Sequence, residues 1–116
     1  MLNMSDMIRG YTDTIILAQL LEHDSYGYEI NKTVQRVTGG LLELKEATLY
    51  TTFRRLEAAG CIQSYWGDET TGARRRYYAV TEAGRELYRE NLADWQKVKT
   101  IIDNLLQGEN GNESQN

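Results

Sequence analysis

Residues 46–59 read EATLYTTFRRLEAA and are followed by Gly60. Leu49, Phe53 and Leu56 lie four and three residues apart, which places them on one face of a helix. Glycine is favoured just after a helix end because it adopts a left-handed backbone without steric cost. The stretch therefore predicts a helix from 46 to 59 with one side buried in a core.

Two runs rich in aromatic and β-branched residues follow this helix. They read CIQSYW at 61–66 and RRYYAVT at 75–81. A polar loop with a glycine at each end, 67–72, joins them. Such runs joined by a polar loop are typical of a β-hairpin, here with a long, solvated tip.

The rest of the chain is predicted to be helical. Apolar residues recur at helical spacing over 5–21 and again over 26–37, where Thr-Gly-Gly at 38–40 ends the pattern. A last helix is predicted from 81 to 106, and it is too long to be covered by so small a core. The polar tail, 107–116, has the composition of a disordered segment.

Composition limits the class of protein. The chain has 116 residues, of which 41% are hydrophobic and 26% charged, so we expect one folded unit. A net charge of −4 excludes a protein that coats nucleic acid by bulk charge, but it allows a local basic patch. One cysteine, Cys61, and one histidine, His23, give neither a disulfide framework nor a zinc site, and we expect no cofactor. No secretory signal or membrane-spanning run is visible, so we expect a cytoplasmic protein.

The predicted order of elements is that of a winged helix-turn-helix. The fold class is mainly α (α+β), with the third helix placed to enter the major groove of DNA and the hairpin placed to touch the neighbouring backbone. We expect a DNA-binding domain over 1–81, a C-terminal helix over 82–106 and a disordered tail over 107–116.

Charge is distributed unevenly along the chain. Residues 1–44 carry three basic and six acidic side chains, and residues 77–116 carry four and seven. Residues 45–76 carry six basic against four acidic, so this is the only positive third. It contains both the third helix and the hairpin, which is where a nucleic-acid surface is expected.

The hairpin carries three consecutive arginines. Alternation along a strand sends Arg74 and Arg76 to one face and Arg75 to the other. Such side chains can clamp phosphates or enter a minor groove. The alternative is a solvated strand edge that guards against aggregation.

The third helix is predicted to present short polar side chains to solvent. Because Leu49, Phe53 and Leu56 point inward, the outward set is Thr48, Thr51, Thr52 and Arg55, flanked by Ala47, Tyr50 and Arg54. Hydroxyls and a small apolar residue suit close approach to base edges and thymine methyls. Tyr50 is expected either to donate to a phosphate or to pack in the core, and Lys45, just before the helix, is a candidate phosphate anchor.

Several short motifs in one order resemble the PadR family of bacterial transcriptional regulators. They are GYEI at 27–30, ATLY at 47–50, RLE at 55–57, SYWGD at 64–68, GARRRYY at 72–78 and TEAG at 81–84. The likeness runs from about residue 15 to residue 105. Its single short C-terminal helix is similar to that of a small subgroup that includes multidrug-binding repressors.

The resemblance implies a homodimer, joined by the last helix with help from the first, that binds a two-fold operator in double-stranded DNA and usually represses. By position, the DNA-facing residues would be Lys45, Thr48, Tyr50, Thr51, Arg54, Arg74 and Arg75. Thr51 departs from the family pattern, because many members have proline there.

Members of the small subgroup bind planar aromatic compounds between two copies of a tryptophan on the last helix, and Trp95 falls at that position. The other ligand-binding residues implied are Thr14, Leu17, Ala18, Asn91, Leu92 and Lys99. Lys99 stands where the most similar member has an acid, so it would disfavour cationic ligands. Alternatively, Trp95 is a hydrophobic residue of the dimer core, on a stripe with Leu92, Ile102 and Leu105.

Two other classes of protein compete with a DNA-binding regulator. An enzyme would need a nucleophile, a base and an orienting group, and neither His23 nor Cys61 belongs to such a pattern. A protein–protein module could use the long helix as a coiled coil without DNA. The arginine triplet next to the third helix favours DNA binding instead.

Overall fold

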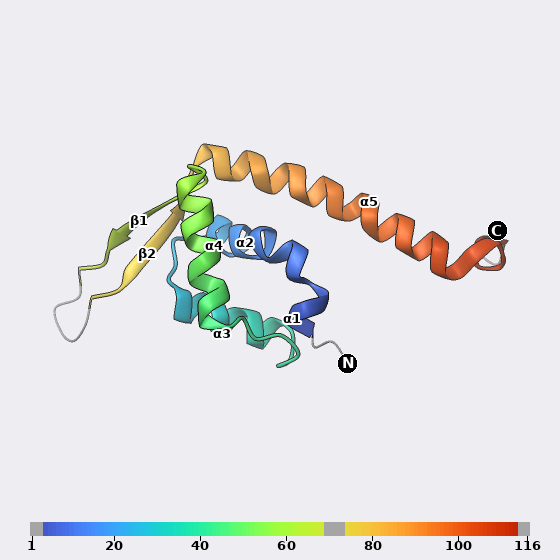
Figure 1. Ribbon diagram of the computed structural model, residues 1–116, viewed down its shortest axis with the longest axis horizontal. Helices are drawn as coiled ribbons and strands as arrows, with labels where there is room; N and C mark the ends of the chain where they lie inside the picture. Colours follow the sequence, from blue (N-terminus) through green and yellow to red (C-terminus); the bar gives the residue numbers. More distant parts are fainter. Residues whose placement is uncertain (1–3, 69–73, 114–116) are drawn as a thin grey trace.

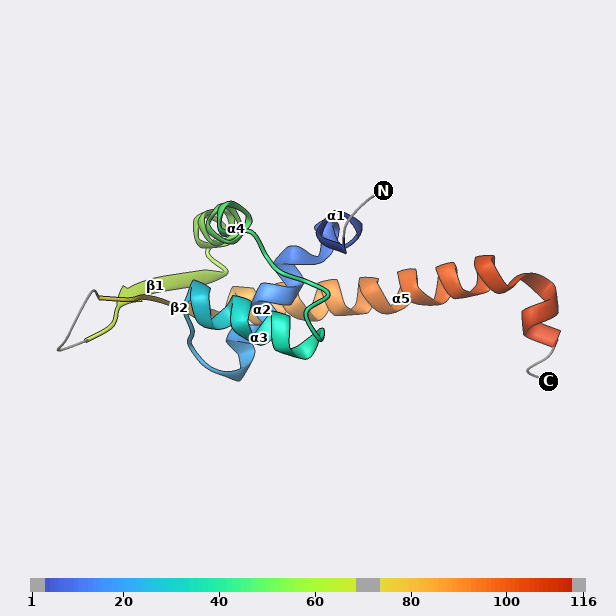
Figure 2. The same ribbon diagram turned by 90° about the horizontal axis from the view of Figure 1, so that it is seen from below.

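The computed structural model describes residues 4–68 and 74–113, and Figure 1 shows its arrangement. In chain order the elements are α1 (Met4–Met7), the 3-10 helix η1 (Arg9–Tyr11), α2 (Thr12–Glu22), α3 (Gly27–Val37), α4 (Glu46–Ala58), β1 (Ile62–Trp66), β2 (Arg76–Val80) and α5 (Glu82–Glu113). The shorter helices gather around one core, the hairpin projects from it, and α5 runs away from both (Figures 1 and 2). This is the predicted winged helix with a long C-terminal helix.

The N-terminal segment differs from the prediction of one helix over 5–21. Ile8 (φ −106°, ψ 12°) and Tyr11 (φ −111°, ψ 5°) leave helical geometry, so α1, η1 and α2 are separate. Gly10 lies at this break, where its backbone freedom disfavours a continuous helix. The bend carries α1 towards the linker before α4, where the Ser5 hydroxyl donates to the Glu43 carbonyl at 3.1 Å.

The Asn31 side chain helps to hold the turn between α3 and α4. The Asn31 amide nitrogen donates to the Leu44 carbonyl at 2.8 Å, and its oxygen accepts from the Leu44 amide at 2.9 Å. Gly39 (φ 61°) and Gly60 (φ 77°) adopt left-handed backbone after α3 and α4, as the sequence predicts. The start of α4 is therefore fixed by side-chain and backbone contacts on both sides of the turn.

The hairpin is a two-stranded antiparallel sheet in which Ser64 pairs with Tyr78 and Trp66 with Arg76. Ser25, in the turn after α2, adds a bridge to Tyr78 through hydrogen bonds of 2.8 and 3.1 Å. The base of the hairpin is thus tied to the helical core. Of the predicted loop, residues 69–72 lie outside the described residues.

The core forms where α2, α3, α4 and the root of the hairpin meet. Its most buried side chains are Phe53, Ile16, Leu17, Leu20, Ile30, Leu56 and Ile62. They come from α2, α3, α4 and β1, whereas α5 adds only the partly buried Leu87 and Tyr88 to this cluster. The small domain is therefore complete before α5 leaves it.

The C-terminal helix makes the molecule elongated, with extents of 62 × 31 × 22 Å. Helical backbone continues to Glu113, with a break at Gly108 (φ 64°, ψ −166°), whereas the sequence predicts disorder from residue 107. Residues 114–116 of that tail lie outside the described residues. Among the described helices, none is both long and apolar enough to cross a membrane.

Candidate nucleic-acid interface and ligand surface

One face of α4 is buried and the other is open to solvent. Leu49, Phe53 and Leu56 are 3%, 1% and 2% exposed, as predicted. The predicted DNA-facing side chains of this region are exposed, namely Lys45, Thr48, Tyr50, Thr51 and Arg54. The helix therefore offers a cation at its start and hydroxyls along its first two turns.

Thr52 was predicted to face outward, and this is wrong: it is 2% exposed. It lies three residues after Leu49 and four before Leu56, so helical geometry places it on the buried stripe between them. The outward face is consequently narrower than predicted, and Thr48 and Thr51 are its hydroxyls.

Tyr50 packs against the core and also keeps part of its side chain at the surface, and its hydrogen bond to a phosphate stays a prediction. Its ring meets Phe53 edge to face, with 5.8 Å between centroids, and its hydroxyl lies against Gly27 at the start of α3. The side chain nevertheless remains 44% exposed. It braces α4 against α3 while keeping one edge at the surface.

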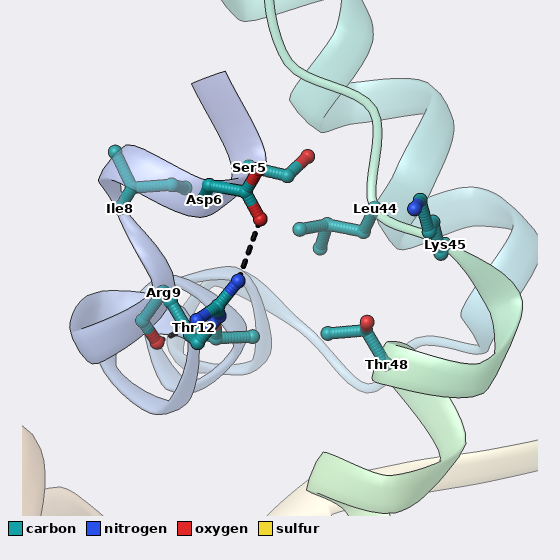
Figure 3. A pocket seen from close by; sticks show the side chains of 8 residues that line it. All are labelled: Ser5, Asp6, Ile8, Arg9, Thr12, Leu44, Lys45 and Thr48. Atoms are coloured by element: carbon teal, nitrogen blue, oxygen red, sulfur yellow. Dashed lines mark hydrogen bonds and ion pairs between the residues drawn. The ribbon is translucent and has the colours of Figure 1, made fainter. Parts of the chain in front are cut away.

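A small pocket of about 150 Å³ separates the start of α4 from the N-terminal segment (Figure 3). Lys45 and Thr48 line it from α4, and Asp6 and Arg9 line it from the opposite side. Arg9 forms an ion pair with Asp6 at 2.6 Å, and its side chain is 77% exposed. Sequence reasoning missed Arg9 because only the folded chain brings it close to α4.

The arginines of the wing lie on both faces of the hairpin, as alternation predicts. The guanidinium carbons of Arg74 and Arg76 are 5.7 and 5.6 Å from the centre of the Trp66 ring, whereas that of Arg75 is 4.9 Å from the Tyr26 ring. Arg76 also donates to the Ser64 hydroxyl at 2.8 Å and lies 3.8 Å from the Glu57 carboxylate of α4. Arg76 thus attaches the wing to α4.

The other face of the hairpin carries stacked tyrosines. Tyr65 stacks on Tyr77 at 5.7 Å, and Tyr77 meets Tyr26 edge to face at 5.3 Å. The Tyr65 hydroxyl donates to the Asp24 carboxylate at 2.6 Å, and this hydrogen bond raises the pKa of Tyr65. These contacts connect the wing to the turn before α3.

Trp95 lies on α5 where that helix passes the N-terminal segment. It is 41% exposed, and its ring meets Tyr11 edge to face at 5.0 Å. Of the other residues predicted to line a ligand site, Thr14, Ala18, Asn91 and Leu92 are partly exposed and Lys99 is exposed. Tyr11, three residues before Thr14, belongs to the same surface and was missed.

Leu17 does not belong to this surface, contrary to the expectation from the sequence. It is 0% exposed and packs in the core of its own domain. Thr14 and Ala18 lie three residues before it and one after it, on the side of α2 that remains partly open. Leu17 therefore contributes to the fold rather than to the ligand surface.

The described residues hold no group of three or more side chains that could bind a metal ion. Cys61 is buried in the core, and His23 is exposed in the turn after α2. The surface that the fold organises is instead made of cations, hydroxyls and aromatic rings on α4 and the wing. Such a composition suits contact with a polyanion.

Fold and surface together define a winged helix DNA-binding protein. A family model described as the transcriptional regulator PadR-like family matches residues 16–90, and the chain belongs to that family. It is therefore a DNA-binding regulator of transcription and not an enzyme.

Similar proteins span most of the chain. An uncharacterised protein from Lysinibacillus sphaericus is 44% identical over 104 residues, which are 90% of this chain and 95% of that protein. A transcriptional regulator from Clostridium thermocellum has a TM-score of 0.79 and 49% identity, covering 85% of this chain and 96% of its own. PadR of Bacillus subtilis, solved in complex with operator DNA, has the same fold, with a TM-score of 0.62, 21% identity and coverage of 69% and 45%.

Proposed function

We propose that the chain is a cytoplasmic homodimeric repressor that binds a two-fold operator, and that a planar aromatic ligand held between two copies of Trp95 lowers its affinity for DNA. It would thus belong with the small PadR subgroup that resembles the multidrug-binding repressor LmrR. The observation that carries this proposal is the uncovered apolar stripe of α5.

Within residues 4–68 and 74–113, this stripe is largely uncovered. Its apolar side chains recur every three or four residues along α5. They are Trp95 (41% exposed), Val98 (37%), Ile102 (47%) and Leu105 (72%). A row of apolar side chains at this spacing is the seam by which helices associate. Exposed apolar surface is costly in water, and a second copy of α5 would remove the stripe from solvent.

A dimer would present two copies of the DNA surface. The proposed contacts are Lys45, Thr48, Tyr50, Thr51 and Arg54 at α4, with Arg74 and Arg75 in the wing. The lysine and the arginines provide charge-assisted contacts to phosphates, while the two threonines are small enough to approach base edges. The two-fold axis would then impose a matching symmetry on the operator.

The ligand site is proposed on either side of the dimer axis at Trp95. An indole is a good stacking surface for a planar ring, and Tyr11 would hold its edge in place. Thr14, Ala18, Asn91 and Leu92 would complete the walls. Lys99, one turn after Trp95, would favour neutral or anionic ligands over cationic ones.

The 3-10 helix η1 connects the proposed ligand site at Trp95 with the start of α4. Tyr11 is the last residue of η1, and Arg9, the first residue of η1, lines the pocket shared with Lys45 and Thr48. A ligand that displaces Tyr11 would therefore shift the segment that abuts the start of α4. By linkage, a ligand that weakens DNA binding must itself bind less well to the DNA complex.

The test is a mobility-shift titration with DNA from upstream of the protein's own gene, with and without a planar dye. We expect binding as a dimer, with affinity falling by about 10³-fold or more between about 50 and 200 mM salt if each dimer neutralises six or more phosphates. The dye should weaken wild-type binding to DNA. Trp95→Ala should bind DNA normally and lose the response to the dye.

A dye response that persists unchanged in Trp95→Ala would disprove the ligand site. A monomer at micromolar concentration that does not shift this DNA would disprove the operator model.

A further inference from the structure

Trp66 is an exposed aromatic side chain in the wing with two cations against it. Its indole is 53% exposed, and it stands at the end of β1 opposite Arg76. Arg74, two residues before Arg76, is the diagonal neighbour on the same face of the hairpin. Both guanidinium groups lie within 6 Å of the ring centre, which is the range of a cation–π contact.

This face of the hairpin is the one that meets α4. Ile62 and Ser64 precede Trp66 at alternate positions, where Ile62 is buried in the core and Ser64 donates to the Glu57 carboxylate of α4 at 2.6 Å. The two strands leave the body near the C-terminal end of α4 and run outward from it (Figures 1 and 2). Trp66 is therefore the outermost residue of β1 on the side of the proposed recognition helix.

The two arginines on Trp66 differ in their other partners. Arg76 donates to Ser64 and faces Glu57, so its charge is compensated by α4. Arg74 forms no ion pair or side-chain hydrogen bond with any residue in 4–68 or 74–113, and its guanidinium lies against the Trp66 ring. Its charge thus remains available to an external anion.

We infer that Trp66 is a positioning residue for DNA binding, which holds the guanidinium of Arg74 on the α4 side of the wing for contact with a phosphate of the operator. Arg76 connects the wing to α4 and does not contact DNA. The inference rests on the proposed function, because it requires that the wing contacts DNA through Arg74.

The physical basis is preorganisation. A free arginine side chain loses rotamer freedom when it binds a phosphate, and a stacked arginine has already lost part of it. The face of the indole attracts the guanidinium but cannot neutralise it, whereas a carboxylate would. Trp66 therefore orders Arg74 without competing with phosphate for its charge.

Arg75 serves as an internal comparison for Arg74, because the two arginines lie against different aromatic rings. It lies over Tyr26 on the opposite face of the hairpin, so its orientation does not depend on Trp66. If both arginines contact DNA, removal of Trp66 should affect the contribution of Arg74 alone.

The experiment is a double-mutant cycle on the full-length protein, with binding to the upstream DNA measured across a salt series. We expect Arg74→Ala to reduce affinity. The salt slope, which is the slope of log K against log salt concentration, should become shallower by the amount that corresponds to about one phosphate contact for each bound wing. Trp66→Ala should weaken binding by about two- to fivefold, as an exposed cation–π contact predicts, and should lower the slope in the same direction. The double variant should bind as Arg74→Ala does.

Trp66→Phe is the conservative variant and should retain most of the affinity, because it keeps an aromatic face. Arg75→Ala is the matched control, since combining it with Trp66→Ala should give additive losses. Thermal unfolding of each variant identifies any loss that reflects misfolding.

The outcomes separate this inference from the proposed function. If Arg74→Ala weakens binding and Trp66→Ala does not, or if the two losses add, the inference is wrong while the wing contact stands. If neither Arg74→Ala nor Arg75→Ala changes affinity or slope, the wing contact itself fails, and the inference fails with it.

Discussion

At the scale of single residues, Gly84 sets the direction of the long helix. A Cβ atom at this position would lie 2.1 Å from the Cys61 carbonyl oxygen and 2.7 Å from a methyl carbon of Val80. Next to it, the Thr81 hydroxyl accepts from the Gly84 amide at 3.2 Å and donates to the Gly60 carbonyl at 2.6 Å. The first turn of α5 is thus capped by threonine and pressed onto the hairpin root where only glycine fits.

Gly84→Ala is expected to destabilise the protein by about 1–3 kcal/mol, because backbone rather than a flexible side chain must move. Gly10→Ala is the control, since nothing lies within 4 Å of its Cβ position. Thermal unfolding measures the melting temperature of both variants. An equal melting temperature for the two variants would contradict the close approach at Gly84.

The burial of Tyr78 leads us to expect that the folded protein loses stability at alkaline pH. It is 5% exposed and stacks on Phe53 at 4.0 Å, and burial raises its pKa above 10.0 although Arg76 opposes the shift. The folded chain therefore holds this proton to higher pH than the unfolded chain does. Its contribution to stability is complete below about pH 10 and is lost as the pH rises through the folded pKa.

The measurement is the free energy of unfolding in urea between pH 7 and about pH 11. Tyr78→Phe should show a smaller decline at the alkaline end than wild type. Tyr28→Phe, whose side chain is 66% exposed, should decline as wild type does. A Tyr78→Phe profile parallel to that of wild type would show that Tyr78 is not the group responsible.

At the scale of the element, α4 has one buried face and one outward face. Two adjacent arginines on its outward side differ in their partners. Arg54 is exposed, whereas Arg55 forms an ion pair with Asp13 of α2. One arginine is therefore available to DNA and its neighbour attaches α4 to the body. The sequence predicts Arg55 on the outward face and Arg54 on its flank, but it does not reveal the ion pair of Arg55.

This difference makes a matched pair of variants. Arg54→Ala should weaken binding to DNA and lower the salt slope by about one phosphate per recognition helix. Arg55→Ala should leave the slope unchanged and reduce stability by no more than about 1 kcal/mol, as expected for an exposed ion pair. Equal salt slopes for the two variants would remove Arg54 from the proposed contacts.

At the scale of the whole molecule, the body and α5 have separate tasks. The core is closed by elements before α5, while the outer half of α5 exposes the apolar stripe. In the proposed dimer, an elongated protomer of 62 Å with such a stripe would be stabilised by pairing with a second copy. The distance between the two DNA surfaces would then depend on how the two copies of α5 pack.

Replacing Ile102 and Leu105 together by glutamate should dissociate the dimer, because both carboxylates would have to be buried at the seam. Thr100→Glu is the control, since 100° per residue places Thr100 on the opposite side of α5. Sedimentation at micromolar concentration measures the oligomeric state of each variant. A dimer that survives the double replacement would place the interface elsewhere.

The sequence by itself determined the family and the order of α3, α4, the hairpin and α5. Periodic apolar residues, glycines after helices and a polar loop between two β-rich runs are local signals, so they predict α3, α4, the hairpin and α5 without knowledge of long-range contacts. The alternation of Arg74 and Arg75 is equally local and is confirmed by their aromatic partners.

Only the tertiary structure decided which surface each side chain occupies. Leu17 is buried because neighbouring elements cover it, and Arg9 reaches the start of α4 because the N-terminal segment bends back. The contact of Trp95 with Tyr11 joins residues 84 positions apart. Such pairings depend on the packing of distant elements, which no local spacing encodes.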